Sequence, residues 1–178
     1  MTQETILITG CSSGIGQITA RLCASRAHRV IATAPSESLL SDCPDNAALK
    51  LVLDVTSEES VTRAVREAEA KLGPISVLIN NAGYCQPGPI EQLSDAQVLR
   101  QFDVNVFGAL RTVRSVLPGM RARKRGRVIN VSSVVGVVSF PFIGLYSASK
   151  HALEAASDAL RIEVAPFLPK EARLSFVT

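Results

Sequence analysis

Tyr146 and Lys150 have the residue types and the spacing to move a proton to or from a carbonyl oxygen. Residues four apart on a helix share one face, so the two side chains would lie together. An ammonium beside a phenol favours the phenolate, which makes the tyrosine a usable acid or base near neutral pH. Ser133 lies upstream of both. A Tyr-x-x-x-Lys pair alone is more often a surface pair of a helix, so the chemistry depends on what the chain places beside it.

A glycine-rich turn near the amino terminus is predicted to hold a phosphate group. The apolar, β-branched run at residues 5–9 is typical of a buried strand, and a helical stretch starts near residue 17. Between them, residues 10–16 read GCSSGIG. Glycines let the backbone approach a ligand, and the free amides and dipole of a helix start attract an anion. A flexible turn with three glycines is the alternative, but the strand before it and the helix after it favour a phosphate cradle.

Predicted strands and helices alternate along the chain, which indicates an α/β protein with a doubly wound parallel sheet. The expected strand order is the Rossmann-like 3-2-1-4-5-6, with a ligand at the carboxyl edge where the order reverses. Strands are predicted at residues 6–9, 29–33, 49–53, 76–79, 127–131 and 173–177. Helices are predicted at residues 14–25, 57–72, 95–123 and 147–165, with a kink near Pro118-Gly119 in the third.

The composition excludes several classes of protein. The 178 residues suffice for one domain, and 47% hydrophobic with 20% charged residues is ordinary for a soluble chain. No apolar run is long enough to span a bilayer and no signal sequence opens the chain, so we expect a cytoplasmic protein. The four cysteines form no C-x-x-C pattern, so we expect no metal site. The basic run RARKRGR at residues 121–127 has no interleaved aromatics and is interpreted as a solvated helix end, not a nucleic-acid site.

A set of motifs together resembles the short-chain dehydrogenase/reductase family in its single-domain form. The motifs follow the order of the family and span nearly the whole chain. They are Thr9-Gly10-x-x-x-Gly14-x-Gly16, Asp54-Val55, Asn80-Asn81-Ala82-Gly83, Asn105, Ser133 and Tyr146-x-x-x-Lys150. In finer detail the chain looks like branches that contain 17β-hydroxysteroid dehydrogenases, retinol dehydrogenases and acyl-dihydroxyacetone-phosphate reductases.

The resemblance implies a binding site for a nicotinamide dinucleotide. Gly10, Gly14 and Gly16 would hold the pyrophosphate, with Ser12, Ser13 and Ile15 in the same turn. Asp54 and Val55 would border the adenine, and Asn81, Ala82 and Gly83 would lie beside the ribose. An ordinary strand-to-helix turn is the alternative for the last motif, because Asn and Gly both favour turns.

The resemblance also implies the catalytic roles. Tyr146 would be the acid or base, and Lys150 would tune it while hydrogen-bonding the nicotinamide ribose. Ser133 would hold the substrate oxygen, and it is preferred over Ser132 because its separation from Tyr146 matches the family. Asn105 would anchor a water chain to the lysine. Its alternative is an asparagine that satisfies backbone groups inside a helix kink.

The end of the second predicted strand bears on the choice of cofactor. It reads Ala32-Thr33-Ala34-Pro35-Ser36, with no acidic residue to repel a 2′-phosphate. Pro35 occupies the position where NADP users of the family carry an arginine. We therefore expect NADP, while Glu37 nearby keeps NAD possible.

The substrate is expected to be a small apolar carbonyl or secondary alcohol, of lipid, steroid or polyketide type. The apolar stretch VVSFPFIGL at residues 137–145 could line the mouth of its site, or could instead pack on the core or a subunit interface. Family members usually continue with a Pro-Gly turn, a substrate lid and a seventh strand. We therefore expect residues 1–178 to form a single dinucleotide-binding oxidoreductase domain whose carboxyl-terminal part and seventh strand are missing. A catalytically inactive nucleotide-binding or interaction protein is the alternative function, and a homo-oligomer such as a dimer is expected in either case.

Overall fold

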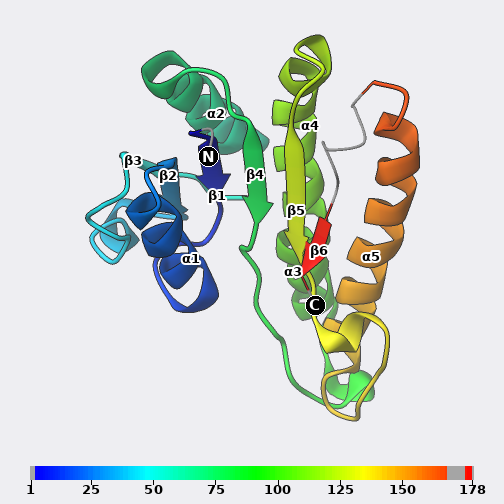
Figure 1. Cartoon of the computed structure of the whole chain (residues 1–178). Coiled ribbons are helices and arrows are strands. Elements are labelled where there is room, and N and C mark those ends of the chain that lie inside the picture. The colour runs from blue at the N-terminus through cyan, green and yellow to red at the C-terminus, as the bar shows by residue number, and fades with distance from the viewer. Residues whose placement is uncertain (1–2, 168–174, 178) are drawn as a thin grey trace.

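The computed structural model describes residues 3–167 and 175–177. Its strands form one parallel sheet in the order β3-β2-β1-β4-β5-β6, which confirms the predicted doubly wound topology (Figure 1). The strands are β1 (Thr5–Ile8), β2 (Arg29–Ala34), β3 (Leu49–Val52), β4 (Val77–Asn80), β5 (Arg127–Val131) and β6 (Ser175–Val177). The start of the predicted sixth strand, residues 173–174, lies outside the described residues.

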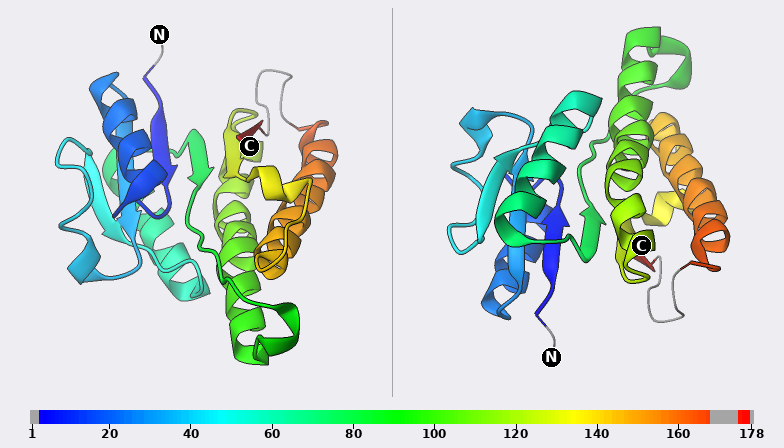
Figure 2. Two further views of the ribbon diagram at one scale, coloured as in Figure 1. Left: turned by 90° about the horizontal axis from the view of Figure 1, so that it is seen from below. Right: turned by 90° about the horizontal axis from the view of Figure 1, so that it is seen from above.

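α-Helices connect consecutive strands except β2 and β3, whose connection contains only a short helical turn. They are α1 (Gly14–Ser25), α2 (Glu58–Leu72), α3 (Asp95–Phe102), α4 (Gly108–Ala122) and α5 (Gly144–Val164). Short helical turns are η1 (Glu37–Leu39), η2 (Ile90–Gln92), η3 (Asp103–Phe107) and η4 (Val134–Gly136). In both views of Figure 2, α4 and α5 lie side by side. Within the described residues, no helix is both long and apolar enough to cross a membrane.

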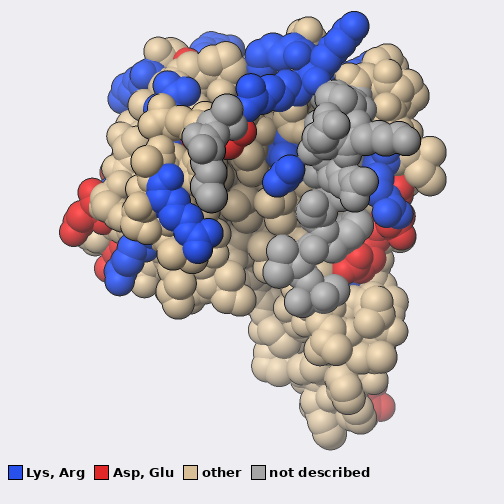
Figure 3. All heavy atoms as spheres, viewed as in Figure 1, with Lys and Arg blue, Asp and Glu red and all other residues tan. Residues whose placement is uncertain are grey.

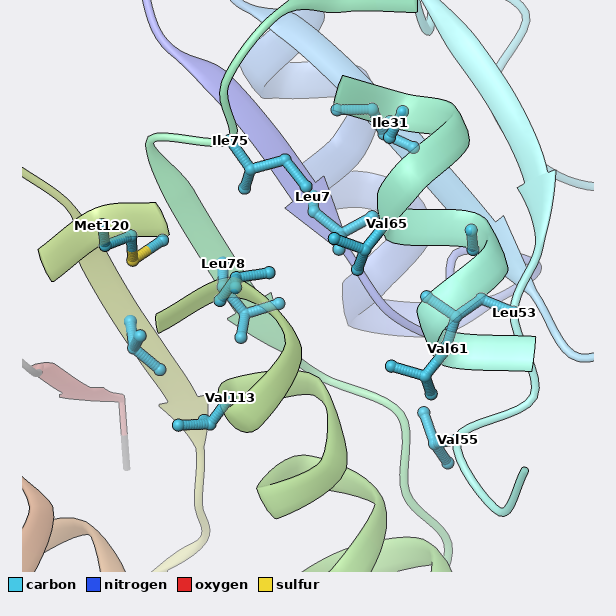
Figure 4. Close-up of a cluster of buried hydrophobic side chains, with 14 of the residues drawn as sticks. Leu7, Ile31, Leu53, Val55, Val61, Val65, Ile75, Leu78, Val113 and Met120 are labelled. Carbon is cyan, nitrogen blue, oxygen red and sulfur yellow. The ribbon is translucent and has the colours of Figure 1, made fainter. Parts of the chain in front are cut away.

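The central strand β1 is buried on both faces, as expected for a strand in the middle of a parallel sheet. Leu7 joins one hydrophobic cluster, formed with side chains of α2 and α4 that include Val61 and Val113 (Figure 4). Ile8 joins a second cluster on the opposite face, which contains Ala20 of α1. The two clusters fix β1 between two helical layers, and so fix the loop that follows it.

The single helix predicted over residues 95–123 is interrupted. α3 ends at Phe102, the segment Asp103–Phe107 is a π-helix, and α4 begins at Gly108. The predicted kink at Pro118-Gly119 is not where the helix changes, because Pro118 lies inside α4. Single π-helical turns occur where a side chain or a functional site requires a local change of register. Here the turn contains Asn105, whose side-chain contacts are described with the site.

A buried chain of side-chain hydrogen bonds joins two strands to two helices on one face of the sheet. Thr112 Oγ1 of α4 donates to Asn80 Oδ1 over 2.6 Å, and Asn80 Nδ2 donates to Asn130 Oδ1 over 2.9 Å. Asn130 Nδ2 then donates to Ser157 Oγ of α5 over 2.7 Å. All four residues are buried, so their polar groups need partners within the protein, which they find in one another and in nearby helix carbonyl oxygens. The network therefore holds α4 and α5 at fixed positions against β4 and β5.

Removing the middle of this network should destabilise the fold. Asn130→Ala leaves polar atoms of Asn80 and Ser157 buried with one partner fewer, which should lower the free energy of unfolding by about 2 kcal/mol. The matched control is Asn46→Ala, because Asn46 is exposed and donates one bond, to the Arg21 carbonyl oxygen. In urea titrations of both variants, the control should lower the free energy of unfolding by less than about 0.5 kcal/mol. Equal losses in the two variants would contradict a stabilising role for the network.

Candidate active site

A pocket of about 670 Å³ opens at the carboxyl edge of the sheet, the edge predicted to bind a ligand. The loops after β1, β3 and β4 line it, together with α5. The predicted site residues among its lining are Gly10, Ser12, Ser13, Gly14, Ile15, Asp54, Val55, Asn81, Ala82, Gly83, Tyr146 and Lys150. Gly16, Asn105 and Ser133 are not among the lining residues. The pocket thus brings the glycine turn and the Tyr-Lys pair, more than 130 residues apart, into one space.

The glycine turn has no room for side chains at two of its three glycines. Gly10 has a φ of +70°, in the left-handed region that favours glycine. A methyl group on Gly16 would lie 2.2 Å from the Gly10 carbonyl oxygen and 2.3 Å from Asn81 Nδ2. Gly16 therefore lies behind the pocket and allows the first turn of α1 to pack against the loop. A backbone turn of this kind, directly before a helix start, fits a pyrophosphate group.

Asn81 fastens the glycine turn to the loop after β4. Its Nδ2 donates to the carbonyl oxygens of Thr9 and Gly10 over 3.0 and 2.9 Å. In return, Thr9 Oγ1 accepts the backbone N–H groups of Asn81 and Ala82, both over 3.0 Å. These bonds join the loops after β1 and β4 at the carboxyl edge of the sheet, where the strand order reverses. The turn interpretation of the Asn80–Gly83 motif is therefore incomplete, because the motif also positions the glycine turn.

Asp54 lies on the pocket wall with its carboxylate held in place. Its Oδ1 accepts the backbone N–H of Thr56 over 2.9 Å and the Thr56 hydroxyl over 2.8 Å. Val55 packs under the start of α4, where a methyl group on Gly108 would lie 2.8 Å from the Val55 side chain. The wall formed by these two residues is therefore fixed before any ligand arrives.

Tyr146 and Lys150 occupy the first two turns of α5, which starts at Gly144 and not at the predicted Ser147. Lys150 Nζ lies 5.7 Å from the centre of the Tyr146 ring. The lysine is 5% exposed, and its Nζ donates to the Val131 carbonyl oxygen over 2.8 Å. Burial lowers the pKa of Lys150, while the negative charge of Glu154 opposes this shift. The pair shares one face of α5 at the pocket, and its role in proton transfer stays a prediction.

Ser132 and Ser133 take different positions at the end of β5. Ser132 lines the pocket, and its buried Oγ has no hydrogen-bond partner among the described residues. Ser133 Oγ accepts the backbone N–H of Val135 over 3.4 Å, at the start of η4. The preference for Ser133 as the residue that holds the substrate oxygen stays a prediction, and Ser132 stays its alternative.

Asn105 is buried inside the π-helical turn with its side chain fully engaged. Its Oδ1 accepts the Tyr84 N–H over 3.0 Å. Its Nδ2 donates to the Tyr84 carbonyl oxygen over 2.9 Å and to Ser149 Oγ over 3.1 Å. These are the contacts expected from the alternative, in which Asn105 satisfies backbone groups at a helix irregularity. They also connect the loop after β4 to α5, and a catalytic role for Asn105 stays a prediction.

Several pocket residues had not been singled out as site residues from the sequence. Tyr84 and Cys85 directly follow the Asn80–Gly83 motif, and this position is the feature of the sequence that indicates a place in the pocket. Arg100 of α3 lies over the Tyr84 ring, with its guanidinium carbon 5.6 Å from the ring centre. Its place in the pocket depends on how α3 crosses the sheet edge, which no local pattern encodes. Among the described residues, no group of acidic, His and Cys side chains could hold a metal ion.

Comparisons with known proteins agree with this geometry. The family model described as short chain dehydrogenase matches residues 4–168. The chain is 43% identical to a 3-ketodihydrosphingosine reductase of Bacteroides thetaiotaomicron, covering 94% of this chain and 61% of that protein. It is 39% identical to human retinol dehydrogenase 8, covering 92% of this chain and 55% of that protein. The chain thus spans little more than half the length of these relatives.

Solved structures with either cofactor have the same fold. A gluconate 5-dehydrogenase from Burkholderia cenocepacia, in complex with NADP and tartrate, superposes with a TM-score of 0.85 and 27% identity. The match covers 94% of this chain and 68% of that one. A xylitol dehydrogenase bound to NAD⁺ gives a TM-score of 0.88 and 28% identity, over 93% of this chain and 66% of that one. The family therefore uses NAD or NADP, and the fold does not select between them.

The packing behind the glycine turn predicts a binding defect. Gly16→Ala places a methyl group against backbone and so displaces the turn, which should weaken dinucleotide binding at least about tenfold. Gly119→Ala in α4 is the matched control, because its methyl group would meet the flexible end of Arg123. Fluorescence titration of both variants with NADPH and NADH measures the effect. Wild-type affinity in a folded Gly16→Ala variant would contradict the proposed role of the turn.

Proposed function

Because the chain belongs to the short-chain dehydrogenase family, we propose that it transfers a hydride between NADP(H) and the carbonyl or secondary alcohol of a small apolar molecule. The observation that carries the proposal is that the glycine turn and the Tyr146–Lys150 pair line one pocket. The turn fits a dinucleotide, and the pair fits proton transfer to or from an oxygen. A hydride and a proton are together what the interconversion of a ketone and an alcohol needs.

The proposed roles combine the geometry of the pocket with those that the family resemblance implies. Residues 10–16 hold the pyrophosphate, and Asp54 with Val55 borders the adenine. Bound NADPH supplies the hydride. Tyr146 donates a proton to the carbonyl oxygen during reduction and removes it from the alcohol during oxidation. Lys150 donates to the Val131 carbonyl oxygen, and its proposed role is to keep a positive charge beside the phenol and to hydrogen-bond the nicotinamide ribose.

An apolar substrate is supported by exposed apolar side chains of two loops at the carboxyl edge of the sheet, although none of these side chains lines the pocket itself. Phe140, Phe142 and Val137 in the β5–α5 loop are exposed, as is Ile90 in η2. The two loops are joined, because the Gly88 N–H donates to the Phe142 carbonyl oxygen over 2.7 Å. Figure 3 shows few charged side chains over the lower part of the molecule, where these loops lie in Figure 1. Two of the relatives are named for lipids, 3-ketodihydrosphingosine and retinol.

The preference for NADP is supported by the end of β2. Pro35 lines the pocket there and is neutral, whereas Glu37 in η1 is exposed and is not among the lining residues. Asp54 does line the pocket, but Thr56 engages one of its carboxylate oxygens. A 2′-phosphate would therefore meet no acidic side chain at the tip of β2, which is the usual means of rejecting NADP.

A catalytically inactive nucleotide-binding or interaction protein is the second candidate. The chain covers 61% of the 3-ketodihydrosphingosine reductase, so activity of the whole protein stays a proposal. A chain that binds NADPH but reduces no carbonyl across a broad panel of ketones would favour this candidate. The homo-oligomer and the cytoplasmic location stay predictions.

Removal of one hydroxyl tests the proton transfer. Tyr146→Phe keeps the ring beside Lys150 but cannot donate a proton, so kcat for reduction of an apolar ketone should fall by at least about 10²-fold. NADPH affinity, measured by fluorescence titration, should stay within about threefold, because nearly all dinucleotide contacts remain. Tyr84→Phe removes the other tyrosine hydroxyl of the pocket and should lower kcat much less than Tyr146→Phe does. Equal turnover in Tyr146→Phe and the wild type would refute the assignment.

Two substitutions at one position test the choice of cofactor. The wild type should show a higher kcat/KM with NADPH than with NADH. Pro35→Arg should increase this preference by adding a cation, and Pro35→Asp should reverse it by repelling the 2′-phosphate. Because both variants lose the same proline, a difference between them reports charge and not loop geometry. A wild-type preference for NADH would overturn the NADP assignment and leave hydride transfer intact.

A further inference from the structure

A carboxylate lies behind the catalytic pair on α5. Tyr146, Lys150 and Glu154 follow one another at four-residue steps and so lie on one face of the helix. Glu154 Oε1 is buried and has no hydrogen-bond partner among the described residues. Other acidic residues of α5 are placed differently, since Asp158 pairs with Arg161 at 2.7 Å and Glu163 is exposed. A buried carboxylate oxygen without a partner is costly, so its place beside the site needs a reason.

The short turn η4 leaves the space into which Glu154 points. A methyl group on Gly136 would lie 3.2 Å from Glu154 Cγ and 3.4 Å from Glu154 Oε1. The same methyl group would lie 2.8 Å from Ser132 Oγ, the second buried oxygen without a partner. The absence of a side chain at Gly136 therefore lets the Glu154 carboxylate pack against the loop that carries Ser132, on the side of α5 that faces the pocket.

Lys150 is the group that this carboxylate affects. Burial of Lys150 lowers its pKa and so favours the neutral amine, and the negative charge of Glu154 acts in the opposite direction. Among the other titratable groups, the Tyr146 ring centre lies 5.7 Å from Lys150 Nζ, and Asp103 of η3 is in an ion pair with Arg111. The pocket wall carries Asp54, Tyr84, Cys85 and Arg100. The negative charge of Glu154, one helical turn away on the same face of α5, raises the pKa of Lys150.

We propose that Glu154 is a positioning residue that keeps the buried Lys150 in its ammonium form, and thereby keeps a positive charge beside Tyr146. This inference rests on the proposed function and deepens it. The neutral amine would still reach the Val131 carbonyl, but it would no longer favour the phenolate of Tyr146. Glu154 acts through Lys150 and does not contact the substrate.

The sign of the expected effect follows from the two opposing influences. Burial already moves the titration of Lys150 to lower pH, and Glu154 moves it partly back. Loss of the carboxylate should therefore move the titration midpoint to still lower pH. For catalysis, the alkaline limb of the kcat profile should begin at lower pH, because the ammonium is lost earlier as pH rises.

The direct test is a pH titration of Lys150 by NMR in the whole chain labelled with ¹³C-lysine, with the signal assigned from Lys150→Arg. In Glu154→Gln, which keeps the shape and removes the charge, the midpoint should shift to lower pH. Glu154→Asp should titrate closer to the wild type, and the exposed control Glu163→Gln should leave the midpoint unchanged. If Glu154→Gln does not fold, Glu154→Met removes the same charge and should give the same direction.

The outcomes separate this inference from the proposed function, because the NMR titration needs no turnover. An unchanged midpoint in the folded, uncharged variants overturns the role of Glu154, even if turnover depends on Tyr146. A shift confined to the Glu154 variants supports the role. That shift in a chain without any turnover supports the role and counts against the proposed reaction.

Discussion

The hydrogen bond from Lys150 Nζ to the Val131 carbonyl oxygen is the contact on which the arrangement of the site depends. It holds a buried amine at the last residue of β5 and ties the start of α5 to the edge of the sheet. Burying a charge is costly unless hydrogen bonds and nearby charges compensate, so its position is strongly constrained. Ser149 and Ser157 make further bonds from α5, to Asn105 and Asn130. With α5 fixed in this way, Tyr146 in its first turn has little freedom to leave the pocket.

The same sheet edge positions the other half of the site. Packing of β1 side chains on both faces of the sheet fixes where the glycine turn begins. Asn81 then ties that turn to the loop after β4. The loop after β4 is in turn held by Asn105, which also contacts α5. The glycine turn and the helix that carries the Tyr-Lys pair are therefore linked through the hydrogen bonds of Asn81 and Asn105. This linkage explains how residues far apart in the sequence come to line one pocket.

Much of the fold could be predicted from the sequence because its signals are local. Buried parallel strands appear as short apolar runs, and β5 was predicted with the bounds that the structure gives. α1 begins and ends where the glycine turn and the following helical stretch indicated. The helix predicted at residues 57–72 is α2, with Ser57 as its N-cap. The glycines, Tyr146 and Lys150 were found because their spacing carries chemistry.

The remaining features depend on contacts between distant segments. The π-helical turn at 103–107 arises where Asn105 meets Tyr84 and Ser149, and neither partner is close in sequence. Asn80, Asn130 and Ser157 look like ordinary polar residues until the fold buries them together. Glu154 looks like a surface residue of α5, because its burial depends on Gly136 in another segment. Sequence patterns reveal which residues can react, but not what holds them in place.

A crystal structure of the chain with saturating NADP⁺ tests the central claim most directly. The account predicts the pyrophosphate on the glycine turn, the nicotinamide ribose within hydrogen-bonding distance of Lys150 Nζ, and the Tyr146 hydroxyl facing the nicotinamide ring. A pocket without dinucleotide under those conditions, or a Tyr146 hydroxyl turned away from a bound ring, would contradict it.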